Sequence, residues 1–341
     1  MIRTSEYCAV GHPDRTCDYI ASFLLDRYLE RDRSARVALE VQLKDTYCTV
    51  SGEVTSGCRF SEGEIAGFVR DAVRAVGYTG EYGDRWGREN TIVADDVEVA
   101  VHLSQQSGDI ARGVDREGWG DQGIFFGMAV NAPERGFMPL DHWLARRIAN
   151  GLAERGWGGI DIKTQVTVED GKPIECVVAI PLLPETEEET KRNIVEYVQA
   201  TAGSGCEVIV NGTGRYVTHG PIGDCGTTGR KLVVDFYGGN SRIGGGSPWG
   251  KDPTKADVAL NRLARRRALD CLKERNLDEV HCAISCAIGR SRIRITLTDA
   301  KGDVIESRTE ECPTSHVIDA LRLAEPNYAE TCRKGLFGNE R

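Results

Sequence analysis

The chain has 341 residues, of which 40% are hydrophobic and 28% are charged, an ordinary composition for a folded globular protein. Because a domain usually takes ~100–150 residues, this length predicts two or three domains. The net charge of −9 argues against a nucleic-acid partner, since a general nucleic-acid binder carries a basic face. The N-terminus lacks the apolar core of a signal peptide and no apolar run reaches membrane-spanning length, so we also expect no membrane association.

The twelve cysteines are spaced too widely for the usual kinds of zinc site. No two are separated by only two residues, and the closest pair is Cys282 and Cys286. Most lie within apolar runs, where cysteine behaves as a small buried hydrophobic residue. We therefore expect reduced thiols and a cytoplasmic location.

The first hundred residues predict a helix, two strands, a second helix and a third strand. Pro13 suits the first turn of a helix whose apolar residues recur at helical spacing as far as residue 28. Ser61 begins a capping box ahead of an amphipathic helix that reaches residue 76. Alternating apolar residues predict the strands, over residues 37–43, 47–54 and 97–103.

The same order of elements returns twice downstream, although the sequences of the copies are not alike. The second pass comprises a helix at 143–152, strands at 162–168 and 174–180, a helix at 187–200 and a strand at 207–210. The third pass comprises a helix at 254–274, strands at 279–288 and 291–298, and a helix at 315–324, without a legible closing strand. We infer a structural repeat from this pattern.

This order favours an α+β fold of three structurally similar domains. Strand pairs joined by short turns predict mixed or antiparallel sheets with helices on one face. We place the domains at residues 1–108, 109–215 and 216–341, the last of them shortened, with termini that are free to cross between domains. Strands that are apolar on both faces, as where Ala38 and Cys48 stand beside Val37 and Val50, indicate that the second face is buried, for which another subunit is a candidate.

Four polar, glycine-rich segments interrupt the periodic pattern. The first, at residues 11–15, opens the first predicted helix, and a helix N-terminus offers free N–H groups and partial positive charge to a phosphate. There His12 could donate to a phosphate or ribose oxygen, and Asp14 could hold a divalent metal. The alternative is that Asp14 only caps the helix and His12 lies on the surface.

The second segment, at residues 105–123, has the length of an active-site lid. The alternative is that it is a mobile loop without a role.

In the third segment, Asp161 and Lys163 project from one face of a predicted strand. They could bind a ribose hydroxyl and a phosphate, or could pair as a surface salt bridge.

The fourth segment, at residues 212–257, holds six Lys or Arg residues and twelve glycines in an otherwise acidic chain. Glycines let the backbone approach a ligand and expose N–H groups to anions. Cations there could neutralise a polyphosphate, namely Arg230, Lys231, Lys251 and Lys255. Acids there could bind metal or a substrate amine, namely Asp224, Asp252 and Asp257. The alternative is a set of flexible, solvated loops.

Residues 245–251 match all but the last position of a nucleotide-binding P-loop, and that last position falls at residue 252. Asp252 replaces the Ser or Thr whose hydroxyl binds magnesium in that motif. The sequence therefore disfavours a P-loop kinase or GTPase.

These segments resemble the signature segments of S-adenosylmethionine synthetases, in the family's order and across nearly the whole chain. The matching stretches are Gly-His-Pro-Asp-Arg at 11–15, Gly-Asp-Gln-Gly at 120–123, Gly-Pro-Ile-Gly-Asp-Cys-Gly-Thr-Thr-Gly-Arg-Lys at 220–231 and Gly-Lys-Asp-Pro-Thr-Lys-Ala-Asp at 250–257. The resemblance implies three α+β domains about a pseudo-threefold axis, in homodimers or dimers of dimers with active sites between subunits. It also implies synthesis of S-adenosylmethionine from ATP and methionine, with hydrolysis of the triphosphate.

The resemblance further implies roles for individual residues. Contacts with ATP are implied for His12, Asp161, Lys163, Arg215, Tyr216, Asp224, Arg230, Lys231, Ser247 and Lys251, of which His12, Lys163, Arg230, Lys231 and Lys251 would be catalytic. Methionine would be bound by Glu53, Gln106, Asp224 and Lys255. Two magnesium ions would be held by Asp14 and Asp257, and a potassium ion would lie near Glu40. Glu6 would lie by the nucleotide, Tyr216 would stack on adenine, and residues 105–115 would form a gate.

The chain departs from the family at a few positions. Val10 and Arg15 stand where the family usually has Glu and Lys, and Ser247-Pro-Trp249 replaces a more usual Ala-Phe-Ser, which brings a bulky ring into the phosphate loop. None of these departures removes a proposed ligand. Three alternatives remain open: a catalytically silent nucleotide-binding homologue, a triphosphatase without alkyl transfer, and an enzyme for a methionine analogue.

Overall fold

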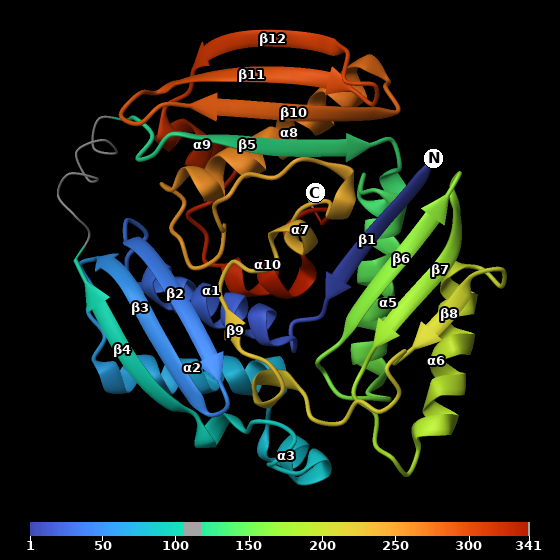
Figure 1. The fold of residues 1–341 in the computed structure, drawn as a ribbon. Helices are drawn as coiled ribbons and strands as arrows, with labels where there is room; N and C mark the ends of the chain where they lie inside the picture. Colours follow the sequence, from blue (N-terminus) through green and yellow to red (C-terminus); the bar gives the residue numbers. More distant parts are fainter. Residues whose placement is uncertain (106–116, 340–341) are drawn as a thin grey trace.

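The computed structural model describes residues 1–105 and 117–339. Within this part of the chain, three four-stranded sheets surround a common centre, each with helices packed against one face (Figure 1). The expected α+β class is therefore confirmed. Over the same residues, no helix has both the length and the apolar character that crossing a bilayer demands.

The first sheet has the strand order β4-β3-β2-β9. Its strands are β2 (Arg36–Lys44), β3 (Tyr47–Thr55), β4 (Glu98–Ser104) and β9 (Gly226–Thr227), and its covering helices are α1 (Pro13–Arg31) and α2 (Glu62–Val76). Val37, Leu39, Val41 and Leu43 of β2 are buried against the helices, whereas the residues between them face outward. The outward residues of β2 are mostly polar and Cys48 lies on the buried side with Val50, so the interpretation that both faces are apolar is wrong for this sheet.

The second sheet has the order β1-β6-β7-β8. It comprises β1 (Ile2–Cys8), β6 (Lys163–Glu169), β7 (Lys172–Ala179) and β8 (Glu207–Val210), covered by α5 (Leu140–Arg155) and α6 (Glu187–Ala202). Its core joins buried residues of both layers, such as Ile148 of α5, Val166 of β6 and Ile194 of α6. The third sheet has the order β12-β11-β10-β5 and comprises β5 (Gly123–Val130), β10 (Glu279–Cys286), β11 (Arg292–Asp299) and β12 (Val304–Glu311). It is covered by α8 (Ala256–Arg275), against which α9 (Thr314–Ala320) packs.

Each sheet takes one strand from a distant part of the chain. β1 pairs with β6, β5 pairs with β10, and the two-residue β9 pairs with β2 at Gln42 and Leu43. The three units are thereby tied together through strand pairing rather than only through loops. β9 also carries part of the glycine-rich segment to the edge of the first sheet.

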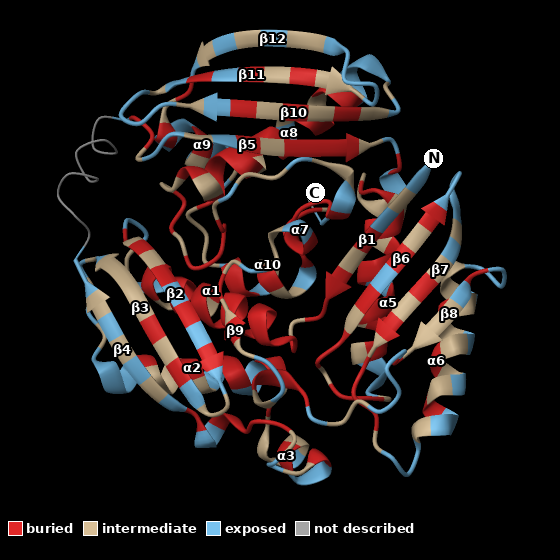
Figure 2. Ribbon diagram, in the orientation of Figure 1, coloured by how far each residue is buried: buried red, intermediate tan, exposed pale blue. Residues whose placement is uncertain are grey.

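The centre of the molecule is filled by α1 and by the C-terminal segment. Fifteen of the nineteen residues of α1 are buried, and Figure 2 shows this helix as mostly buried along its length. Asp26 of α1 accepts hydrogen bonds from the backbone N–H groups of Tyr328 and Ala329, both at 2.9 Å, and so caps α10 (Tyr328–Lys334).

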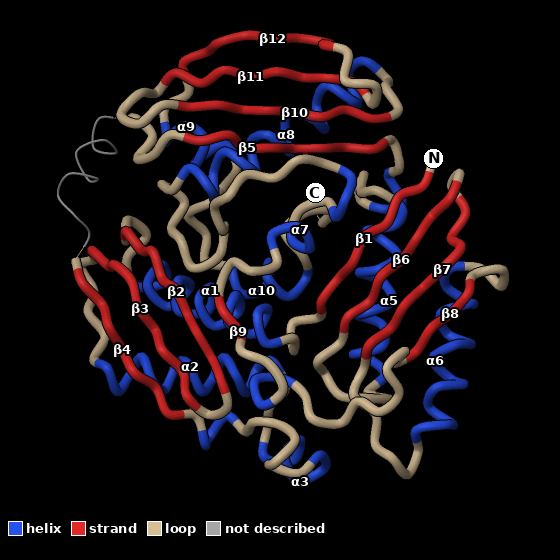
Figure 3. The backbone as a smooth tube through the Cα atoms, viewed as in Figure 1, coloured by secondary structure: helices blue, strands red, loops and turns tan. Residues whose placement is uncertain are grey.

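The glycine-rich segment between β8 and α8 runs through the space between the sheets, mostly as loop (Figure 3). It includes the short helix α7 (Leu232–Asp235). The remaining short helix, α3 (Gly80–Trp86), follows α2. The N-terminus of α1 and these loops therefore meet at the centre of the molecule.

Candidate active site

His12 caps the N-terminus of α1 with its side chain. Its Nδ1 accepts a hydrogen bond from the backbone N–H of Asp14 at 3.2 Å, so the ring proton lies on Nε2. The side chain is buried, and this burial, with the nearby Lys231 cation, lowers the pKa of His12 to about 3. His12 is thus a neutral donor near pH 7, and the alternative that it lies on the surface is wrong.

Asp14 is a buried carboxylate surrounded by donors, so the alternative that it only caps the helix is wrong. It accepts from the backbone N–H of Thr227 at 2.9 Å and from Nζ of Lys231 at 2.5 Å, and Nε of Arg230 lies 3.8 Å away. Burial acts to raise the pKa of Asp14, but the bonds from Lys231 and Thr227 outweigh burial and hold the pKa below its usual value. The carboxylate is therefore ionised and in contact with two cations.

The backbone that carries these cations is held in place on several sides. The N–H of Gly229 donates to Asp18 of α1 at 2.8 Å, and β9 pairs with β2. Gly229 has a positive φ of 79°, and a Cβ there would lie 2.9 Å from the Cβ of Ser247, so only glycine allows the two loops this close approach. The alternative of flexible, solvated loops is wrong for residues 226–231.

Asp18 was not found from the sequence. It lies four residues after Asp14 and therefore on the same face of α1, next to the same loop. Helical spacing from a candidate ligand is the signal that could have found it.

Asp161 and Lys163 do not pair with each other. Asp161, which precedes β6 rather than lying on it, accepts from the hydroxyl of Tyr216 at 2.7 Å and from the N–H of Gly220 at 2.8 Å. Burial raises its pKa to about 6. Nζ of Lys163 instead lies 3.4 Å from a carboxylate oxygen of Glu6 on β1, so the surface salt bridge between Asp161 and Lys163 is wrong.

The groups around Asp14 and Lys163 adjoin one another. An open pocket of about 300 Å³ is lined by Glu6 together with residues 229–234, which include Arg230 and Lys231. Lys163 and Lys231 also both contribute to the lowered pKa of His12, after burial. Glu6, Lys163 and the cations of the loop thus share one part of the surface.

Lys251 and Asp257 form a further charged pair. Nζ of Lys251 lies 2.7 Å from Oδ2 of Asp257, in the first turn of α8. The backbone of Lys251 bridges to Ala38 of β2, which lies opposite Glu53 in the sheet. Glu40, two residues from Ala38, faces the same side. The register therefore brings the predicted residues Glu40, Glu53 and Lys251 to one region of the outer face.

The two charged pairs lie along the same edge of β2. Thr227, which donates to Asp14, pairs with Gln42, whereas Lys251 bridges to Ala38. Four strand residues separate Gln42 from Ala38, a distance of about 13 Å along β2. The arrangement can bind a polyanion between α1 and the edge of this sheet.

The remaining predicted residues differ in their surroundings. Asp224 is exposed and accepts from the N–H of Cys225 at 2.8 Å, and Ser247 accepts from the N–H of Trp249 at 3.2 Å. Nζ of Lys255 lies 3.9 Å from Asp252. Arg215 is exposed. Gln106 and most of the predicted gate, residues 106–115, lie outside the described residues.

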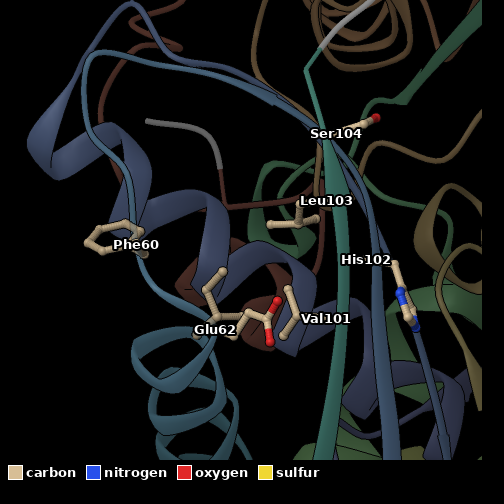
Figure 4. Close-up of a pocket in the computed structure, with 7 residues that line it drawn as sticks. Phe60, Glu62, Val101, His102, Leu103 and Ser104 are labelled. Carbon is tan, nitrogen blue, oxygen red and sulfur yellow. The ribbon is translucent and has the colours of Figure 1, made fainter.

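A separate depression of about 590 Å³ lies at the edge strand β4, lined by Phe60, Glu62, Ile65, Val101, His102, Leu103 and Ser104. Figure 4 shows Val101 and Leu103 on one side of the strand and His102 on the other. Its lining includes none of the predicted site residues, and Glu62 is its one formally charged side chain at neutral pH, so the depression does not suit a polyphosphate.

The structure is that of an α+β protein with a cluster of lysine and arginine side chains beside the N-terminus of α1 and the edge of β2. Sequence models of the three S-adenosylmethionine synthetase domains match nearly all of the chain. The N-terminal domain matches residues 1–108, the central domain residues 116–216 and the C-terminal domain residues 218–341. The chain belongs to the S-adenosylmethionine synthetase family. This membership confirms the resemblance of the motifs and the enzyme class that the resemblance implied, methionine adenosyltransferase.

Relatives and a solved structure agree with this membership. The S-adenosylmethionine synthase of Helicobacter hepaticus is 36% identical over 368 aligned positions, covering 99% of this chain and 92% of the relative. That of Clostridium tetani is 35% identical, covering 98% and 93%. The structure of an unusual S-adenosylmethionine synthetase from Campylobacter jejuni is 28% identical, with a TM-score of 0.87, and the match covers 99% of this chain and 95% of that one.

Proposed function

We propose that this chain joins methionine to ATP to form S-adenosylmethionine and then hydrolyses the triphosphate to pyrophosphate and phosphate. The observation that carries the proposal is the ionised Asp14, which lies between Lys231 and Arg230 at the N-terminus of α1. A buried carboxylate among cations suits a magnesium–triphosphate group, because metal, lysine and phosphate can exchange partners there.

The reaction is an in-line displacement in which the methionine sulfur attacks C5′ of ATP and triphosphate leaves. A thioether sulfur carries no proton, so the step needs no general base and depends on positioning and on stabilising the leaving group. Neutral His12 can donate from Nε2 to the departing oxygen. The charge of the triphosphate would be neutralised by Lys163, Arg230, Lys231 and Lys251.

We propose that Asp14 and Asp257 each hold one magnesium ion. Mg²⁺ is usually bound by one or two carboxylates, with water and substrate phosphates as its other ligands. Asp14 and Asp257 would each supply one such carboxylate, and each carboxylate already lies beside a lysine that could bind phosphate. Lys231 and Lys251 now contact these carboxylates and would turn to phosphate oxygens when the metals bind. When bound, magnesium neutralises charge on the triphosphate, and Glu40 is the proposed potassium ligand.

The substrates are proposed to lie on either side of the phosphates. The Tyr216 ring would stack on adenine and Asp161 would meet the ribose, with Arg215, Asp224 and Ser247 as further nucleotide contacts. Glu53, Gln106, Asp224 and Lys255 would bind methionine. The bond from Tyr216 to Asp161 supports this arrangement, because it fixes the ring beside the carboxylate.

We also propose a homodimer or a dimer of dimers with active sites at the subunit interface. Tyr47 on β3 and Ile124 on β5 are 64% and 56% exposed on outer faces of two sheets, as suits a contact surface. The twelve free cysteines support the proposed cytoplasmic location. Sedimentation of the purified protein at assay concentrations tests the assembly, and a monomer that is fully active would contradict it.

The proposed reaction is tested by incubation with ATP, methionine, magnesium and potassium, followed by chromatography. We expect the sulfonium product in equal amount to pyrophosphate and phosphate. Phosphate release without methionine would instead indicate a triphosphatase, and nucleotide binding without turnover would indicate a silent homologue. Product formation only with a methionine analogue would show that the analogue, and not methionine, is the substrate.

A further inference from the structure

Behind the proposed site lies a buried group of three side chains, Arg15, Asp235 and Trp249, which we call the buried trio. Arg15 forms a salt bridge with Asp235 through Nη1, and Nε1 of Trp249 donates to the other carboxylate oxygen of Asp235 at 2.8 Å. The guanidinium carbon of Arg15 lies 5.2 Å from the centroid of the Trp249 ring. The three side chains are at most 4% exposed, so substrate does not reach them.

Each member of the buried trio lies close in sequence to a proposed ligand. Arg15 directly follows Asp14. The backbone N–H of Asp235 donates to the carbonyl of Lys231 at 2.9 Å, one helical turn away in α7. Trp249 lies two residues before Lys251, and the intervening Gly250 accepts from the N–H of Leu39 on β2. The buried trio therefore joins the three segments from which Asp14, Lys231 and Lys251 extend.

The contacts of the buried trio use the two ends of a planar guanidinium and the N–H of an indole. Arg15 also contacts Asp18 at 3.1 Å through Nη1, and its Nη2 donates to the carbonyl of Cys332 at 2.8 Å. A lysine ammonium has no planar fork with which to meet several acceptors at fixed positions. The structure also places the Arg15 guanidinium over the Trp249 ring, so these two residues contact each other as well as Asp235.

We propose that Arg15, Asp235 and Trp249 are positioning residues that set the spacing of Asp14, Lys231 and Lys251 along the triphosphate. This inference rests on the proposed function. It adds that the buried trio holds the three separate segments at fixed distances from one another. Separating a buried charge from its partner leaves that charge uncompensated at a high cost in free energy, so the buried trio resists shifts of any one segment. A shift of about 1 Å in a catalytic group can cost about 100-fold in rate.

The test compares Trp249→Phe and Arg15→Lys with the unaltered enzyme. Trp249→Phe keeps an aromatic ring over Arg15 but removes the N–H that donates to Asp235. Arg15→Lys keeps the positive charge but removes the planar pair of nitrogens that contact Asp235 and Cys332. For each we expect a fall in kcat of about 10- to 100-fold with the KM for methionine within about twofold. Calorimetry with inorganic tripolyphosphate should show about a tenfold weaker affinity.

The double variant Arg15→Lys/Trp249→Phe tests the coupling directly. Because both substitutions disturb the same carboxylate, we expect its loss in kcat to be clearly smaller than the product of the two single losses. Trp157→Phe is the matched control, since an arginine also lies over the Trp157 ring, Arg155 at 5.5 Å, where Trp157 contacts Tyr197 of α6. This control should leave kcat and tripolyphosphate affinity unchanged.

Three outcomes would overturn the positioning role. One is that both single variants bind tripolyphosphate and turn over like the unaltered enzyme. Another is that their activity falls only in proportion to the unfolded fraction, measured by thermal denaturation. The third is that the two losses multiply without coupling. If the unaltered chain forms no sulfonium product, the proposed reaction fails, whereas tripolyphosphate affinities of the variants still decide whether the buried trio positions the anion ligands.

Discussion

Replacing Lys251 with alanine is expected to lower kcat for product formation by about 10²–10³-fold while the chain keeps its fold. Removal of one preorganised group that stabilises charge in a transition state has an effect of this size. The Lys251 ammonium lies 2.7 Å from Asp257, at the edge of β2. The link to Ala38 is made by the backbone, which alanine retains. Asp257 is partly exposed, so water can solvate its carboxylate when the lysine is removed.

The Lys251→Ala measurement combines product chromatography with thermal unfolding. Lys172→Ala is the matched control, because Lys172 is an exposed lysine on β7, in a different sheet. We expect the control to match the unaltered enzyme in both assays. Near-normal turnover by Lys251→Ala would show that this residue has no catalytic role. Loss of the cooperative thermal unfolding transition would show that its role is structural.

Local sequence signals predicted most of the helices and strands that form the three units. The predicted capping box is present: the Ser61 side chain accepts from the N–H of Glu64, and α2 begins at Glu62, directly after Ser61. The strand at 207–210 has the bounds that were expected. These features depend on neighbours within a few residues, which is why a pattern read along the chain can find them.

The strands that tie the units together could not be found this way. β1 lacks clear alternation, and its partner β6 lies about 160 residues away in the chain. β12 closes the third sheet, but it is a polar edge strand, Val304–Glu311, with little apolar signal. β9 is two residues long and exists only through its pairing with β2. Non-local pairing determines such strands, and a single sequence does not record it.

The site shows the same division between local and distant information. The motifs identified Asp14 and Lys231 as candidates, but their contact joins residues 217 positions apart. The sequence also placed the Trp249 ring in the phosphate loop, whereas the ring is fully buried against Arg15. Residue type indicates which chemistry is available, and only the packing of α1 against the loops decides which groups meet.

Replacing Asp14 with asparagine is the second change for which we expect a large effect, a fall in kcat of about 10²–10³-fold. The amide oxygen can still accept from the N–H of Thr227, so the loop keeps this bond. The negative charge that faces Lys231 and Arg230 is lost, and with it the proposed magnesium ligand. The loss of one partner of a charged hydrogen bond should also lower the free energy of unfolding by about 1–3 kcal/mol.

The two proposed roles of Asp14 can be separated by titrating magnesium. If the carboxylate holds the metal, the Asp14→Asn enzyme should need a higher magnesium concentration for half-maximal activity, because an amide is a weaker ligand than a carboxylate. If Asp14 only orients Lys231, kcat should fall with no change in the magnesium requirement. Asp71→Asn, at an exposed position of α2, controls for the loss of one negative charge. An Asp14→Asn enzyme with unaltered kcat and magnesium dependence would remove Asp14 from the site, and the proposal that a metal–triphosphate group binds at the N-terminus of α1 would fail with it.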